Sequence, residues 1–234
     1  MIRLERFVAP CLAPLFWVLP ALADAQEVDK AIFHYSQLEL DASRSTGSTL
    51  ATWEGNGWIG TDFDRLWWST EGERFGGDFE DAELTLVYGH YARRFWDIVV
   101  GVRHEIKPVS QSYLTFGILG LAPYWFEVGL FGAVSDNGRP SVRVEAETDL
   151  FVTQRLILQP LVHFDALIVD DPDLGLEGGT RTFELGFLTR YEIRRKFAPY
   201  LSFKWVSEQE SVVGAPDQPD LEGFQLGLGI RLIH

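Results

Sequence analysis

Two histidines with acidic neighbours are the residues of this chain best suited to metal chemistry. His163 and Asp165 are two positions apart, and His104 is followed directly by Glu105. Imidazole and carboxylate together suit a borderline metal ion such as Cu(II). Residues two apart in a strand share a face, so His163 and Asp165 could bind one ion. We therefore take His163, Asp165, His104 and Glu105 as candidate metal ligands, with a position at a membrane rim as the alternative for His104.

The segment just before His163 carries charges at alternate positions. In the run 141–150, Val142, Val144 and Ala146 alternate with Arg143, Glu145, Glu147 and Asp149. This period of two predicts a strand with one apolar and one charged face. The apolar face could cover a protein core or meet lipid. Four charges on one strand exceed what a soluble sheet usually needs, whereas a transmembrane barrel turns apolar residues to lipid and polar residues into its lumen.

Extended to the whole chain, the alternation predicts a charged inner face on which acids outnumber bases. A cation site in the lumen is one interpretation. The other is a network of Arg–carboxylate pairs, which we favour because charges in a low dielectric need partners. The predicted inward residues are Arg65, Glu71, Glu83, Asp97, Arg103, Glu105, Glu127, Arg143, Glu145, Glu147, Asp149, Arg155, Gln159, His163, Asp165, Glu184, Arg190, Glu192, Lys204 and Arg231.

Two further patterns could carry chemistry, and each has a simpler interpretation. The segment 170–173, Asp-Asp-Pro-Asp, offers oxygen ligands to a hard cation such as Ca²⁺. It lacks the spacing of a known calcium loop, so we expect a solvated acidic turn. His163 and Asp165 could instead be the base and orienting acid of a hydrolase. Ser69 and Ser202 look like ordinary strand residues, so we expect no enzyme.

Twelve alternating segments must position these residues. Most are about ten residues long, which is the length that a tilted strand needs to cross a bilayer. Pro160 falls inside one of them and predicts a bulge or weak point there. The predicted strands are 31–41, 49–60, 63–73, 80–92, 94–106, 111–122, 124–135, 139–151, 154–168, 181–193, 197–207 and 223–233.

The connections between these segments alternate in character. Polar stretches such as DASRSTGS (41–48) and ERFGGDF (73–79) follow odd-numbered segments, and short turns such as TDF (61–63) follow even-numbered ones. Outer-membrane barrels show this alternation, with short turns on the periplasmic side. A soluble sandwich has no reason to keep it. We therefore predict an all-β fold, a twelve-stranded antiparallel transmembrane β-barrel with both termini periplasmic.

The N-terminus predicts export. Arg3 and Arg6 precede an apolar segment (7–22), and Ala-x-Ala patterns end at Ala23 and Ala25, as in a secretory signal peptide. A membrane anchor is the alternative, but the apolar run is short and interrupted by prolines. We expect a cleaved signal peptide at 1–25 and a barrel domain at 26–234, in the bacterial cell outer membrane.

Charge and cysteine content narrow the possible partners. The formal net charge is −14. This argues against a nucleic-acid partner, because phosphate contacts need a basic surface. Cys11 is the only cysteine. It lies inside the predicted signal peptide, so we expect no disulfide in the mature chain.

Six stretches, which follow one another along nearly the whole predicted barrel, carry a family resemblance. They are GWIGTDFDRLWWSTEGE (57–73), EDAELTLVYGHYARRFWDIVVGVRHEIKP (80–108), GLAPYWFEVGLFGAVSDNGR (120–139), RVEAETDLFVTQRLILQP (143–160), DDPDLGLEGG (170–179) and RYEIRRKFAPYLSFKW (190–205). With them the chain resembles the outer-membrane copper resistance protein B family of bacterial copper tolerance operons.

The resemblance implies a barrel that supports copper tolerance by binding, sequestering or passing copper ions. It also implies outer-membrane lipid and periplasmic copper-resistance proteins as partners; we expect a monomer. Many family members carry a Met- and His-rich segment before the barrel, whereas Met1 is the only methionine here. A general small pore or structural barrel without a copper role is therefore the alternative, and a lipid-modifying barrel enzyme is a more distant one.

Overall fold

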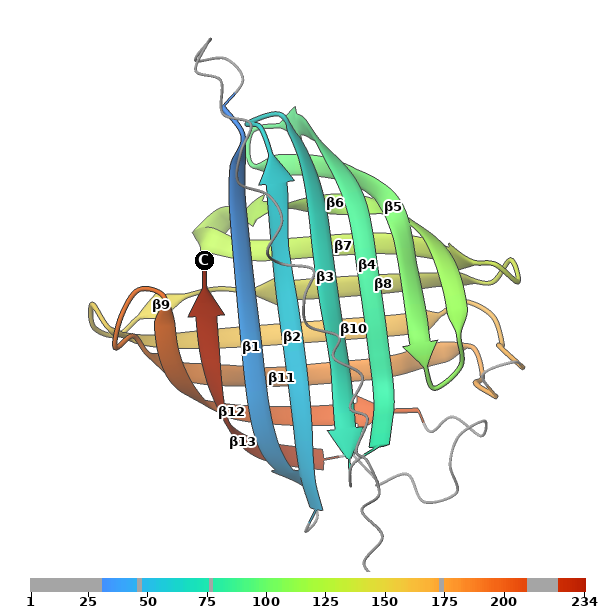
Figure 1. Cartoon of the computed structure of the whole chain (residues 1–234). Coiled ribbons are helices and arrows are strands. Elements are labelled where there is room, and N and C mark those ends of the chain that lie inside the picture. Colours follow the sequence, from blue (N-terminus) through green and yellow to red (C-terminus); the bar gives the residue numbers. More distant parts are fainter. Residues whose placement is uncertain (1–30, 46–47, 76–77, 173–174, 210–222) are drawn as a thin grey trace, which may run out of the picture. The chain divides into compact units, whose positions relative to one another are not determined.

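Thirteen strands make the twelve crossings of a closed antiparallel barrel in this computed structural model (Figure 1). The structure describes residues 31–45, 48–75, 78–172, 175–209 and 223–234, so the predicted signal peptide lies outside the described residues. The strands are β1 (Phe33–Ser45), β2 (Ser48–Gly60), β3 (Asp64–Phe75), β4 (Asp78–Arg93), β5 (Trp96–Lys107), β6 (Gln111–Ala122), β7 (Phe126–Ser135), β8 (Pro140–Glu147), β9 (Leu150–Phe151), β10 (Leu156–Leu167), β11 (Gly179–Tyr191), β12 (Phe197–Glu208) and β13 (Gly223–Ile233).

The strands β8 and β9 are two parts of one crossing, since both pair with β10. The break at Thr148 and Asp149 lies opposite Pro160, which has no amide hydrogen to donate to a ladder. The amide of Thr148 still donates to the carbonyl of Pro160, at 3.3 Å. The weak point predicted at Pro160 is thus an interruption of the ladder.

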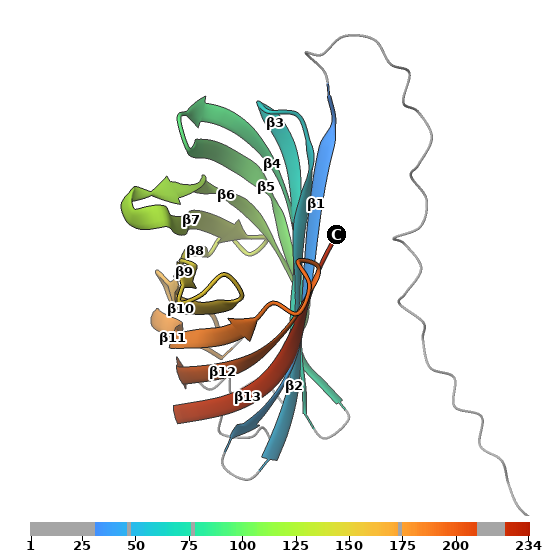
Figure 2. The same ribbon diagram turned by 90° about the vertical axis from the view of Figure 1, so that its left-hand side faces the viewer.

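The barrel closes where the last strand meets the first. β13 pairs with β1, with Arg231 opposite Glu39, and this closure leaves no free sheet edge. Figure 1 shows β1 to β4 crossing in front of β7, β8 and β10, as strands on opposite walls of a tilted barrel do. In Figure 2, β8 to β10 lie on the wall opposite β1 to β3. The predicted twelve-stranded barrel is confirmed.

Two predicted loops are wrong in extent. The strands β1 and β2 pair as far as Ser45 and Ser48, and β3 and β4 pair as far as Phe75 and Asp78. Most of the two polar stretches 41–48 and 73–79 is therefore strand. Pairing within a hairpin satisfies the backbone hydrogen bonds of such residues as well as water would, so polar side chains did not end the strands.

The outer face of the barrel is apolar and exposed. Leu84, Leu86 and Tyr88 of β4 are between 43 and 50 % exposed, whereas Glu83 and Val87, which point to the other face, are almost fully buried. Leu226 and Leu228 of β13 are more than 60 % exposed, as lipid-facing residues would be. No helix in the described residues is long and apolar enough to cross a membrane.

Candidate functional site

The barrel encloses a cavity of about 1210 Å³ that is strongly acidic. Among the residues that the structure describes, its lining includes fifteen Asp or Glu residues, five Arg or Lys residues and one histidine, His163. The predicted excess of acids over bases on the inner face is thus confirmed. The acids are not distributed evenly, because some are paired with arginines and others are not.

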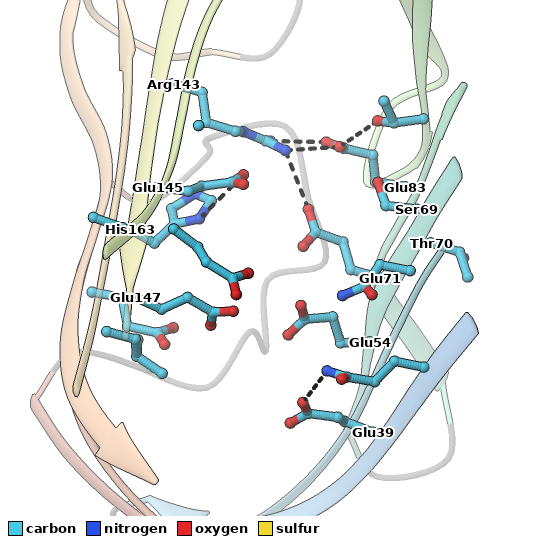
Figure 3. A pocket seen from close by; sticks show the side chains of 18 of the residues that line it. Glu39, Glu54, Ser69, Thr70, Glu71, Glu83, Arg143, Glu145, Glu147 and His163 are labelled. Carbon is cyan, nitrogen blue, oxygen red and sulfur yellow. Dashed lines mark hydrogen bonds and ion pairs between the residues drawn. The ribbon is translucent and has the colours of Figure 1, made fainter. Parts of the chain in front are cut away.

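One part of the lumen is a compact group of paired charges, which we call the arginine knot: Arg103, Arg143 and Arg181 with Glu83, Glu105 and Asp165. Arg143 reaches from β8 across the lumen and donates two hydrogen bonds to Glu83 of β4, at 2.8 and 2.9 Å (Figure 3). Its Nε donates to Asp165 of β10 at 3.0 Å. Such a bidentate pair fixes both the distance and the orientation of its partners.

The other two arginines complete the knot. Arg181 donates to Glu105 at 2.7 Å. Arg103 lies within 3.6 to 3.8 Å of Asp165, Glu83 and Glu105, and its guanidinium lies over the ring of Tyr113. Three cations therefore meet three nearly fully buried acids, and the knot joins opposite walls of the barrel near the ends of the strands that carry the long connections.

Five glutamates form a second feature, which we call the glutamate ladder. Glu39, Glu54, Glu71, Glu83 and Glu105 lie directly opposite one another on the consecutive strands β1 to β5. Like charges at directly opposed positions repel. Arg231 pairs with Glu39 at one end, and the knot holds Glu83 and Glu105 at the other. Glu54, the second of the five, pairs with no residue in the part of the chain that the structure describes.

The wall opposite the ladder carries His163. Its Nδ1 lies 3.9 Å from Oε1 of Glu145, which occupies the directly opposed position on β8 (Figure 3). Glu147 lies on the same wall, and Figure 3 shows all three side chains facing Glu54 and Glu71 across the cavity. An imidazole and several carboxylates therefore line one space.

The two residues of the predicted ligand pair His163 and Asp165 have different partners in the structure. His163 and Asp165 share the inner face of β10, as expected, but the Asp165 carboxylate is held by Arg143 and Arg103. Glu145, from the neighbouring strand, is the acid that meets His163. Cross-strand register, rather than spacing along one strand, sets this pair.

His104 and Glu105 lie on opposite faces of β5. Glu105 is buried in the knot, whereas Nδ1 of His104 lies 3.0 Å from Oγ of Ser112 outside the cavity. Adjacent strand residues point to opposite faces, so these two side chains do not form one site. No group of three or more His, Cys, Asp or Glu residues arranged to hold a metal occurs in the described ranges.

Two other assignments need correction. Arg155 lies in the short turn before β10, and Glu192 directly follows the end of β11. Neither lies on the inner face of a strand, where both were predicted. Asp171 is not a solvated turn residue: it is 1 % exposed and paired with Arg139 and Gln111. The charged strand residues that line the cavity and that the alternation missed are Glu39, Asp41, Glu54, Glu73, Asp81, Arg181 and Glu208.

Residues 30–234 match the protein family described as copper resistance protein B precursor. The chain belongs to the copper resistance protein B family. It is 41 % identical over 179 residues to copper resistance protein B of Escherichia coli, covering 76 % of this chain and 60 % of that protein. It is 38 % identical over 189 residues to a copper resistance protein B homolog of Pseudomonas syringae pv. tomato, covering 80 % of this chain and 64 % of that protein.

The chain thus spans less than two thirds of the length of these copper resistance protein B relatives. Among solved structures, the barrel is similar to the NanC porin, with a TM-score of 0.59, 12 % identity, and coverage of 83 % of this chain and 98 % of the porin. At that identity the likeness shows the fold alone. Family and fold together place this protein in the bacterial outer membrane.

Proposed function

We propose that this chain is a non-enzymatic outer-membrane barrel that contributes to copper tolerance by admitting Cu(II) to its acidic lumen. His163 and Glu145 are the proposed ligands. The observation that supports the proposal is the meeting of an imidazole and a carboxylate, 3.9 Å apart, in a cavity with an excess of acids. The excess negative charge attracts cations, and the histidine adds the nitrogen ligand that distinguishes copper from harder ions.

The available donors fit Cu(II) better than Cu(I). Met1 and Cys11 are the only sulfur-bearing residues, and both precede the barrel. Cu(I) prefers thioether and thiolate ligands, whereas imidazole and carboxylate suit Cu(II). His163 binds a metal through a neutral ring nitrogen and Glu145 through an ionised carboxylate, so binding weakens as either group takes up a proton.

The lumen geometry favours binding or passage over catalysis. A Ser-His-acid site needs an acid that orients the histidine and a serine within reach of it. Asp165 is instead held by arginines, and Ser202 donates its hydrogen bond to Asp41 at 2.9 Å. Neither group is positioned for acyl transfer with His163.

Copper binding and copper tolerance test this proposal together. We expect a strain lacking the gene to be copper-sensitive, and the wild-type gene to restore tolerance. The double variant His163→Gln/Glu145→Gln should fold but restore little tolerance, and calorimetry on the purified protein should show weakened Cu(II) binding. His104→Gln, on the outer face, is the matched control and should behave as wild type.

Unchanged copper tolerance of the deletion strain, with no heat of Cu(II) binding, would reject the copper role. A small general pore would then be the better account, because the cavity is large and the fold is that of a porin. Conductance in planar bilayers that is the same with and without copper would support that second function.

A further inference from the structure

The barrel rim formed by the short turns, which we call the periplasmic rim, is basic although the chain as a whole is acidic. Three of its five turns, each taken with the strand residue on either side, carry six cations. The acids counted in the same way are Asp62, Asp64 and Glu192, and Asp64 pairs with His90. The six cations, all exposed, are Arg93, Arg94, Arg155, Arg194, Arg195 and Lys196.

These cations differ from those inside the barrel. The arginines of the knot are all paired with carboxylates, whereas none of the six rim cations forms an ion pair with a residue that the structure describes. The lumen arginines therefore have a structural use within the chain. The rim cations are left to interact with something outside it.

Aromatic residues project from turns of the same rim, one of which also carries Arg94. Tyr124 is 87 % exposed and Trp125 74 % exposed in the short helix η2 (Pro123–Trp125). Phe95, which also lines the cavity, is 54 % exposed, with the guanidinium of Arg94 over its ring. Tyrosine and tryptophan gather where a membrane meets water, because their rings suit the headgroup region.

The backbone of these turns holds the aromatics in an uncommon conformation. Phe95, Tyr124 and Trp125 have φ values of 71°, 68° and 65°. They are the three non-glycine residues with positive φ among the described residues, and bulky residues rarely adopt this conformation. Strained residues that persist are often ones whose position is used, and all three lie in periplasmic turns.

We propose that the periplasmic rim binds the headgroups of anionic phospholipids in the inner leaflet of the outer membrane. The short turns lie on the periplasmic side of such barrels, so these cations meet inner-leaflet headgroups. Clustered Lys and Arg residues at a membrane surface attract anionic lipid, and the exposed aromatics hold the rim at headgroup depth. This surface is separate from the proposed copper site.

The test is lipid preference of the full protein purified from outer membranes. Native mass spectrometry in detergent micelles holding equal phosphatidylglycerol and phosphatidylcholine should show retained phosphatidylglycerol in excess. Arg194→Gln/Arg195→Gln should reduce that preference by about fivefold or more, and raised salt should reduce it in the wild type. Arg93→Gln/Arg94→Gln, at a different turn, should also reduce the preference for phosphatidylglycerol. This second variant replaces the first if the first does not fold.

The matched control is Arg44→Gln/Lys107→Gln, which removes the same charge from exposed residues at the opposite end of the barrel. It should leave the preference unchanged. Equal retention of the two lipids by the wild type, or equal loss in the control and rim variants, would overturn the proposal. Retention of an acidic periplasmic protein without any lipid preference would also overturn it, by assigning the rim to a protein partner.

Discussion

The arginine knot and the glutamate ladder share Glu83 and Glu105 but balance their charges in opposite ways. In the knot every buried acid meets an arginine, so the group ties opposite walls of the barrel together. At Glu54 the ladder sets carboxylates against one another without a cation. A protein keeps such local repulsion where another use outweighs it. We therefore infer that the knot stabilises the barrel and that the ladder and the wall opposite it attract cations.

The largest expected effect comes from breaking the knot. Replacing Arg143 with Met removes the partner of Glu83 and Asp165 and leaves two buried carboxylates without it. Removing one member of a buried ion pair costs about 3–5 kcal/mol. We expect a loss of that size in the free energy of unfolding by urea in micelles.

Arg143→Lys is the control for charge. Lysine keeps the cation but loses the two parallel hydrogen bonds to Glu83, so an intermediate loss is expected. If Arg143→Met unfolds at the same urea concentration as the wild type, the knot does not hold the walls together.

The ladder should respond with the opposite sign. Glu54→Gln keeps the size of the side chain and removes the charge that faces Glu39 and Glu71. Opposed like charges cost a fraction of a kcal/mol each, so we expect a gain of about 0.5 kcal/mol in unfolding free energy. A clear loss of stability would show that the Glu54 carboxylate makes a stabilising contact, so that its repulsion by Glu39 and Glu71 is not the dominant effect.

Salt should give the smallest effect. Raising the ionic strength screens the repulsion between the exposed Glu54 carboxylate and its neighbours Glu39 and Glu71 more than it weakens the buried knot. Wild-type stability should rise by a few tenths of a kcal/mol, and the rise should be smaller in Glu54→Gln. The measurement is the urea midpoint of each protein at low and high salt. An equal rise in both proteins would show that repulsion in the ladder is not the cause of the salt effect.

The fold could be predicted from the sequence because its signals are local. Period-two alternation around Val142, Val144 and Ala146 and the alternating connections were enough to predict twelve membrane strands. The alternation was least informative in β2, where Trp53, Gly55 and Trp58 occupy both faces and conceal the inward position of Glu54.

The candidate site was only partly predictable, because it depends on register between strands. Spacing along β10 predicts that His163 and Asp165 share a face, which they do. It does not predict that Arg143 forms an ion pair with Asp165 or that Glu145 lies beside His163, since the pairing of β8 with β10 determines both. The ladder likewise requires four registers, none of which can be read from one strand.

The most direct test of the central claim is electron paramagnetic resonance of Cu(II) bound to the tag-free protein purified from outer membranes. We expect nitrogen hyperfine splitting from one imidazole, lost in His163→Gln and kept in His104→Gln and His90→Gln, whose histidines do not line the cavity. A spectrum that His163→Gln leaves unchanged would contradict the proposal that the acidic lumen holds the copper site.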